Sequence, residues 1–322
     1  MTQTAVLPDL FATTTNNTPT DTDFAERLRQ ETTAVRLRRS KWGVSKTLDK
    51  QQKQMAADPF GADGTKLAAS KKLVDVSHPK FKAVTKILNL ANQYWQQMTV
   101  PYPEDGIRLI RTEKVAEFDA QIARLQSELD GAVAQLNQAY WDLRRKAQHD
   151  LGSLFNPADY PDSLDGMFAL SVEYPSVDPD ERLRQLNPAL YEREQRRIQE
   201  RFDEAVRLAE EAFLSELAEL VEHLCGRLEG AGDGTSRIFR DSAVTNLTEF
   251  FARFRQLNIG SNAELDRLVA QAQGAVRNVT PQRLRDNDAL RKTVHFALSN
   301  VQQHLDQMMV DRPKRAIRFN DE

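Results

Sequence analysis

The longest regular pattern of apolar positions runs from Thr112 to Leu151, where apolar residues recur at alternating steps of three and four. This spacing is the a/d seam of a coiled coil or a helical hairpin, kept over about five heptads. We expect a helix of about 39 residues, close to 60 Å long, with Thr112 as its N-cap and Gly152 after its end. The seam consists of Val115, Phe118, Ile122, Leu125, Leu129, Ala132, Leu136, Ala139, Leu143 and Ala147.

A second long apolar stripe follows from about Pro188 to Glu229, after a Pro-rich connector at 152–186. Its mean step near 3.7 favours packing in a globular bundle over part of its length. Two long helices joined by a compact connector predict an antiparallel hairpin over 112–229. The alternative is a seam shared between two chains, which would make a homo-oligomer. The second stripe consists of Ile198, Phe202, Val206, Ala209, Phe213, Leu217, Leu220, Leu224 and Leu228.

Shorter helical patterns flank these two. A stripe from Phe81 to Met98 predicts a helix that begins at Pro79. Beyond a Gly-rich hinge at 230–234, Asn262 and Thr280 are suitable N-caps. We expect three helices there, at about 237–257, 262–277 and 281–311.

A small β element is also expected. Phe168 to Tyr174 alternates apolar and polar residues, as a strand does, and could pair with Ile107 to Ile110 or with the segment around the Trp42-Gly43 turn. Gly61 and Gly64 are too close for a phosphate-binding loop, so we interpret the Asp63-Gly64 pair as an ordinary turn before a helix.

The fold class predicted is therefore mainly α, with a long antiparallel helical hairpin or coiled coil, a helical bundle and a small β element at the connectors. The expected organisation is a disordered tail (1–22), a basic N-terminal region of short elements and a helix (23–111), the hairpin (112–229), a C-terminal helical region (235–311) and a basic tail (312–322).

Composition supports extended helices. The 322 residues are 40% hydrophobic but only 7% aromatic, and the mean hydropathy is −0.59. Cys225 is the single cysteine, which excludes an intramolecular disulfide and favours a reducing compartment. Without a signal-peptide pattern or a membrane-spanning window, we expect a cytoplasmic protein and no membrane partner.

Charge is concentrated in residues 27–86, which carry 15 Lys and Arg against 5 Asp and Glu in a chain of net charge −3. Such a segment could follow a nucleic-acid backbone, with an aromatic ring stacking on a base, or dock on an acidic protein. The candidate patch is Arg36, Arg38, Arg39, Lys41, Trp42, Lys46, Lys50 and Lys53.

The C-terminal tail is a second candidate. It alternates basic and apolar residues and could add a strand to a partner's sheet or occupy an acidic groove, unless it is simply an unstructured end. Its candidate docking residues are Arg312, Lys314, Arg315, Arg318 and Phe319.

Catalytic signatures are absent from the sequence. None of the five histidines lies in a His-Glu-x-x-His or Glu-x-x-His pattern. His223 and Cys225 are two residues apart and would point to different faces of a helix, which disfavours a dyad. We therefore expect no catalytic residues, no cofactor and no metal.

The region from about Arg39 to Glu173 resembles an uncharacterised family of bacterial and phage helical proteins. The resemblance lies in Trp42-Gly43, in SKKLVD at 70–75, in PYPEDGIRLI at 101–110, and in the stretch from Ala147 through LGSLF to ADYPDSLDGMF ending at 168. Tyr102 stands where the family usually has Trp. The family has no known activity, but its members are often encoded near MoxR-type AAA+ ATPases, which implies an adaptor or substrate of such an ATPase.

Two functions follow as expectations. The first is a non-enzymatic helical scaffold or adaptor that mediates protein–protein interaction, with an AAA+ ATPase as a candidate partner. The alternative is a nucleic-acid-binding accessory protein that uses the basic segment 27–86.

Overall fold

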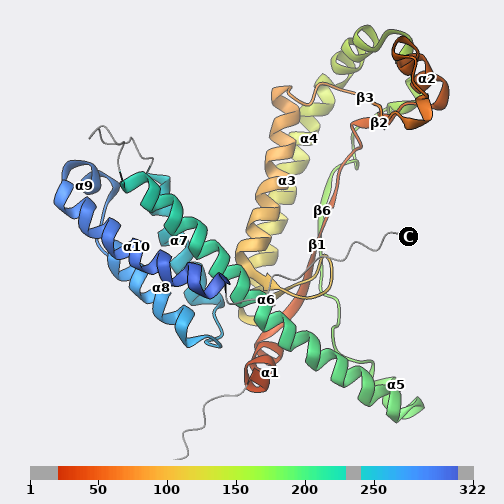
Figure 1. The fold of residues 1–322 in the computed structure, drawn as a ribbon. Coiled ribbons are helices and arrows are strands. Elements are labelled where there is room, and N and C mark those ends of the chain that lie inside the picture. The colour runs from red at the N-terminus through yellow and green to blue at the C-terminus, as the bar shows by residue number, and fades with distance from the viewer. Residues whose placement is uncertain (1–20, 230–240, 311–322) are drawn as a thin grey trace, which may run out of the picture.

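The computed structural model describes residues 21–229 and 241–310, and within them the chain is mainly α-helical, as expected (Figure 1). The expected hinge at 230–234, the basic tail at 312–322 and all but two residues of the expected tail at 1–22 lie outside this part. The helices are α1 (Asp21–Glu31), α2 (Lys50–Ala57), α3 (Pro79–Met98), α4 (Val115–Leu151), α5 (Glu181–Leu186), α6 (Pro188–Leu228), α7 (Ser242–Leu257), α8 (Ala263–Val276), α9 (Pro281–Asp286) and α10 (Asp288–Val310). The strands are β1 (Thr32–Ser40), β2 (Ser45–Thr47), β3 (Ser70–Lys72), β4 (Thr99–Pro101), β5 (Arg108–Arg111) and β6 (Ala169–Glu173).

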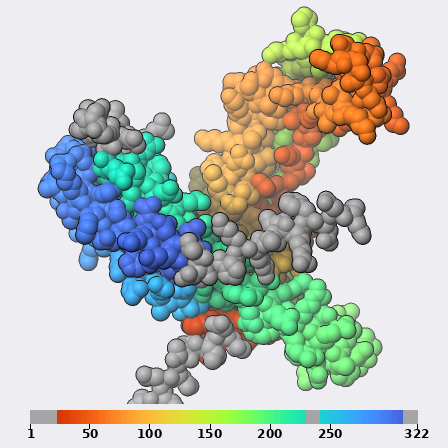
Figure 2. All heavy atoms as spheres, in the orientation of Figure 1, coloured from red at the N-terminus to blue at the C-terminus, as the bar shows by residue number. Residues whose placement is uncertain are grey.

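Two arms diverge from a small sheet (Figures 1 and 2). In one arm α3 and α4 run side by side with β1 and β6 and end at a tip made by α2, β2 and β3. In the other arm the end of α6 packs with α7, α8, α9 and α10. Each arm has its own hydrophobic core, so the apolar stripes of the sequence are buried in two separate clusters.

The sheet, in the order β4-β5-β1-β6, separates the two cores. Because side chains alternate along a strand, its two faces carry different residues. Ala34 and Leu109 belong to the core of the α6 arm, whereas Val35 and Ile110 belong to the core of the α3–α4 arm. The expected strand at 168–174 is confirmed as β6, which pairs with the second half of β1, while β5 pairs with the first half.

The expected hairpin between the two long helices was wrong. The buried stripe of α4 packs against α3 and β6, and that of α6 packs against α1, α7 and α10. The β4–β5 turn reverses the chain directly after α3 and brings α3 beside α4, so this shorter helix covers the seam. The seam of α4 is thus covered within the chain.

Several helix ends differ from the expected ones. Thr112 lies in a 3-10 turn, Thr112–Lys114, and α4 begins only at Val115, without a side-chain cap. The helix expected at 281–311 is broken at Asn287, whose side chain accepts a hydrogen bond from the Leu290 amide and so starts α10. Asn262 and Thr280 do cap α8 and α9.

The tip also corrects two turn predictions. The segment around Trp42-Gly43, which was expected to be a short strand or hairpin, contains two strands that do not pair with each other, because β1 pairs with β6 and β2 pairs with β3. The Asp63-Gly64 turn is followed by a short 3-10 turn and β3, not by a helix. Gly64 is required there, since an added Cβ would lie 2.6 Å from the backbone of Gln54.

Candidate functional site: a basic groove between β1 and α3

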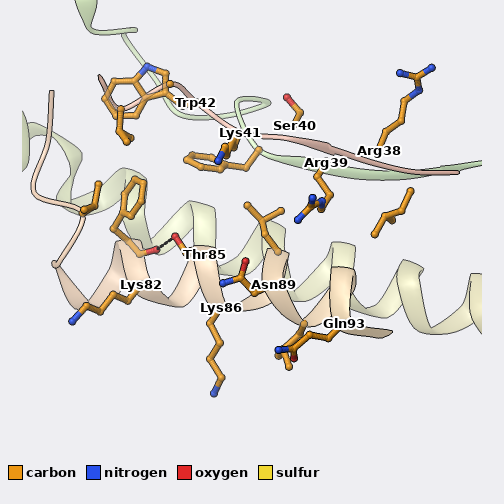
Figure 3. A pocket seen from close by; sticks show the side chains of 18 of the residues that line it. Arg38, Arg39, Ser40, Lys41, Trp42, Lys82, Thr85, Lys86, Asn89 and Gln93 are labelled. Carbon is orange, nitrogen blue, oxygen red and sulfur yellow. Dashed lines mark hydrogen bonds between the residues drawn. The ribbon is translucent and has the colours of Figure 1, made fainter. Parts of the chain in front are cut away.

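An open groove of about 1700 Å³ separates the second half of β1 from α3 (Figure 3). Apolar side chains of the α3–α4 core line its base, chiefly Leu37, Phe81 and Leu88. The groove therefore has a strand as one wall and a helix as the other.

The sequence explains both walls. In β1, Val35 and Leu37 belong to the α3–α4 core, and Arg39 continues the same face beyond it. In α3, Thr85, Asn89 and Gln93 follow one another at steps of four, outside the buried stripe, and all three line the groove. Figure 3 shows Arg39 extending from β1 towards α3.

Two of the predicted cations in β1 are neutralised by carboxylates. Arg36 lies 3.7 Å from Glu104 and 3.6 Å from Glu173, and Arg38 forms a hydrogen-bonded ion pair with Glu173. The hydrogen bond from Arg38 is the main reason that the pKa of Glu173 lies below its usual value. Because Glu173 is in β6, these two arginines link β1 to β6 and contribute little free positive charge to the groove.

Four other cations that line the groove have no carboxylate partner among the described residues: Arg39, Lys41, Lys82 and Lys86. All four are exposed. Figure 3 shows Lys82 and Lys86 extending from α3 away from β1, so their ammonium groups point out of the groove rather than into it. The groove has one acidic lining residue in the described part, Asp105, which leaves its lining positively charged.

Trp42 is not a free stacking platform, contrary to the role considered from the sequence. Its ring packs edge-on against Tyr140, with centroids 5.8 Å apart, and lies tilted against Tyr160, with centroids 6.4 Å apart. The tryptophan closes one end of the groove, where it packs against Tyr140 of α4 and Tyr160 of the connector.

The remaining predicted patch residues lie elsewhere. Lys46 pairs with Asp159, a buried carboxylate of the connector. Lys50 and Lys53 are on α2 in the tip and do not line the groove. The structure thus brings Arg36, Arg38, Arg39, Lys41 and Trp42 to the groove and separates the other three.

Sequence reasoning missed the α3 wall. The signal was present in the spacing of Thr85, Asn89 and Gln93, each four residues from the next on a helix and outside its apolar stripe. The tail residues Arg312, Lys314, Arg315, Arg318 and Phe319 lie outside the described part of the chain.

A second cavity, of about 600 Å³, lies between α3 and helices α6 and α7. Arg108 lines it, and burial is the main reason that the pKa of this guanidinium falls to about 10. Two of its nitrogens are used within the fold, because Nε donates to the Thr99 hydroxyl at 2.7 Å and a terminal nitrogen donates to the Thr99 carbonyl at 3.0 Å. This arginine joins β5 to β4.

Residues 21–229 and 241–310 contain no group of three or more His, Cys, Asp or Glu side chains that could hold a metal ion. No helix in the same ranges is both long and apolar enough to cross a bilayer. Comparison of the chain with protein-family models, with curated proteins and with solved structures gave no match.

Proposed function

We propose that this protein is a non-enzymatic adaptor whose basic groove between β1 and α3 binds an acidic segment of a partner protein. The observation that carries the proposal is the pair of strand-wall cations without carboxylate partners in the described residues, Arg39 and Lys41. Lys82 and Lys86 on α3 add positive charge beside the groove. Complementary charge speeds encounter and selects partners, and an apolar base adds contact area once the charges have met.

The groove supports a polypeptide ligand better than a small molecule. It is long and open, bounded by a strand and a helix, and its polar groups are spread along both walls rather than converging on one point. Small-molecule sites bury most of their ligand and use a few convergent polar groups.

The test is the binding of a fluorescently labelled peptide, an acetylated and amidated heptapeptide of alternating glutamate and threonine. Arg39→Glu with Lys41→Glu reverses two charges of the strand wall and should abolish binding. Lys50→Glu with Lys53→Glu makes the same change of charge on α2 and should reduce binding only slightly, through the weaker overall field. Equal loss in both variants would contradict a groove site.

The alternative function is nucleic-acid binding through the basic segment 27–86. The same groove cations favour it, whereas the packing of Trp42 against Tyr140 and Tyr160 speaks against base stacking. Labelled oligothymidylate separates the two functions. A backbone ligand that contacts four cations should show a slope of about −3 when log affinity is plotted against log salt concentration, with binding tighter than that of the heptapeptide.

Because residues 39–173 resemble a family often encoded near MoxR-type AAA+ ATPases, an ATPase of this type is the partner to test first. Co-elution of the two purified proteins, measured with the wild type and with the Arg39→Glu, Lys41→Glu variant, tests that choice. Loss of the complex in the variant alone supports an ATPase bound at the groove.

A further inference from the structure

The strand wall of the groove has a backbone edge that the sheet leaves open. Strands β5 and β6 pair with different halves of β1, with residues 32–35 and 36–40 respectively. Whether they share one edge of β1 or lie on opposite edges follows from the direction of the backbone groups, because these alternate along an antiparallel strand.

On the β6 side, the amide of Leu170 donates to the side chain of Gln126 at 2.6 Å. Leu170 therefore directs its backbone away from β1, and it and its partner Arg39 form a non-hydrogen-bonded pair. The neighbouring residues Arg38 and Ser40 bond to β6, and Leu37 and Arg39 turn their N–H and C=O groups to the opposite edge.

On the β5 side, Pro101 is opposite Arg108 and has no N–H to donate. The bonded pair between β4 and β5 is therefore Val100 with Leu109, which leaves Arg108 and Ile110 directed towards β1. Their partners in β1 are Val35 and Thr33. Residues 33, 35, 37 and 39 are every second residue of the strand, so their backbone N–H and C=O groups all point to the same edge of β1. Strands β5 and β6 thus lie on opposite edges of β1.

The β5 edge of β1 is consequently covered only as far as Val35, opposite Arg108. Beyond it, the backbone groups of Leu37 and Arg39 have no partner strand among the described residues, and no loop or side chain there bonds to them. Both residues line the groove.

The α3 wall fits an added strand. Thr85, Asn89 and Gln93 recur every four helical residues, which is about 6 Å along the axis. Alternate residues of a strand recur at about 6.7 Å. Figure 3 shows β1 and α3 running along each other across the groove, so successive side chains of an added strand can each meet one of these polar groups.

We infer that the acidic partner segment binds as an extended strand, which hydrogen-bonds to the open edge of β1 at Leu37 and Arg39 and continues the line of β5. This inference rests on the function proposed above and specifies how the partner segment binds in the groove. The open edge from Leu37 to Lys41 is five residues long, about 17 Å, so the bound segment has five to seven residues. Its acidic side chains alternate, because Arg39 and the α3 polar groups face the same side of the added strand.

Exposed edge strands are often protected by charged side chains alone, and Arg39 and Lys41 could serve only that purpose. Blocking the backbone amides of the peptide distinguishes strand addition from simple protection of the edge. Two forms of the heptapeptide, one N-methylated at every glutamate and the other at every threonine, block the two alternate sets of amides, four amides in one form and three in the other.

Strand addition uses one of these two sets. One methylated peptide should therefore bind at least about tenfold more weakly than the other, which corresponds to roughly 1.4 kcal/mol or one to two hydrogen bonds. Affinities within twofold of each other would overturn the inference while leaving the charge-dependent binding intact. If the unmethylated peptide binds the Arg39→Glu, Lys41→Glu variant as tightly as the wild type, the proposed function fails and the strand inference fails with it.

Amide hydrogen exchange of the full chain provides a second, independent test of strand addition. Exchange at Leu37 and Arg39 should slow at least about tenfold when the heptapeptide is added, because a new hydrogen bond protects each amide. Exchange at Arg38 and Ser40, which already bond to β6, should change little. Unchanged exchange at Leu37 and Arg39 in the saturated complex would overturn strand addition.

Discussion

Lys71 and Asp159 form an ion pair inside the tip, with 2.7 Å between Lys71 Nζ and Asp159 Oδ2 and with 6% and 1% of their side chains exposed. Lys71 also donates to the carbonyl of Leu154 at 2.7 Å, and Lys46 pairs with the other oxygen of Asp159 from the solvent side. Residues far apart in the sequence thereby join β2 and β3 to the connector that follows α4. The tip closes one end of the groove, so this pair holds the site's surroundings in place.

Replacing Asp159 tests how much the pair stabilises the tip. Asp159→Asn leaves the buried Lys71 ammonium without its counter-charge, and we expect the free energy of unfolding to fall by about 3–5 kcal/mol. Urea unfolding followed by circular dichroism measures the change. Lys46→Met is the matched control and should cost less than about 1 kcal/mol, because the Lys46 side chain is 56% exposed and Lys71 keeps its partner. A similar loss in both variants would show that the buried pair has no special role.

Because the pKa of Asp159 is lowered in the folded protein, we expect the stability of the fold to depend on pH. Hydrogen bonds from Lys46 and Lys71 hold the pKa of Asp159 below its usual value of 3.8. A carboxyl with a lower pKa in the folded state stabilises the fold above its unfolded pKa, and this contribution is lost as the pH falls below about 4. Between pH 7 and pH 3, the urea midpoint of the wild type should fall further than that of Asp159→Asn. Parallel falls would contradict the assignment.

Replacement of Gly64 and of Gly131 by alanine should change the stability of the protein in opposite directions. Gly64→Ala would place a Cβ 2.6 Å from the Gln54 backbone and should destabilise the protein by about 1–3 kcal/mol. Gly131→Ala, inside α4, meets no atom within 4 Å and should stabilise it by about 0.5–1 kcal/mol through helix propensity. Thermal unfolding of both variants checks the signs. A stabilising Gly64→Ala would mean that the tip packs differently.

Cys225 should react slowly in the folded protein. It is 4% exposed, burial raises the pKa of its thiol, and Ser299 Oγ lies 3.9 Å from its sulfur. Because the thiolate is the reacting form and must first be exposed, Ellman's reagent should label it at least about a hundredfold more slowly in buffer than in denaturant. Comparable rates would show that the end of α6 opens readily.

Local patterns predicted the helices well but not their partners. The step of three and four along α4 and α6 shows that each helix has one apolar face, and most of each predicted face is buried. In the middle of α4 the buried residues are Val133 and Tyr140 rather than the predicted Ala132 and Ala139. That period does not specify which element covers each face. The choice depends on the β4–β5 turn, which returns the chain beside α3, and on the two faces of β1, which divide the apolar residues between two cores.

The candidate site was predicted in part for the same reason. Arg39 and Lys41 belong to the local run of cations and remain in the groove. Trp42 and Lys46 belong to the same run but pack against Tyr140 and pair with Asp159, which lie about a hundred residues further along the chain. Composition alone does not show which cations of a basic segment already have a partner in the fold.

The most direct test of the basic groove as the binding site is a map of amide chemical-shift changes in the isotopically labelled protein as the acidic heptapeptide is added. The largest changes should fall on two segments that are distant in sequence, Leu37 to Lys41 and Lys82 to Gln93, and should vanish in the Arg39→Glu, Lys41→Glu variant. Changes confined to α2 or to the α7–α10 arm, or changes that persist in the variant, would contradict a binding site between β1 and α3.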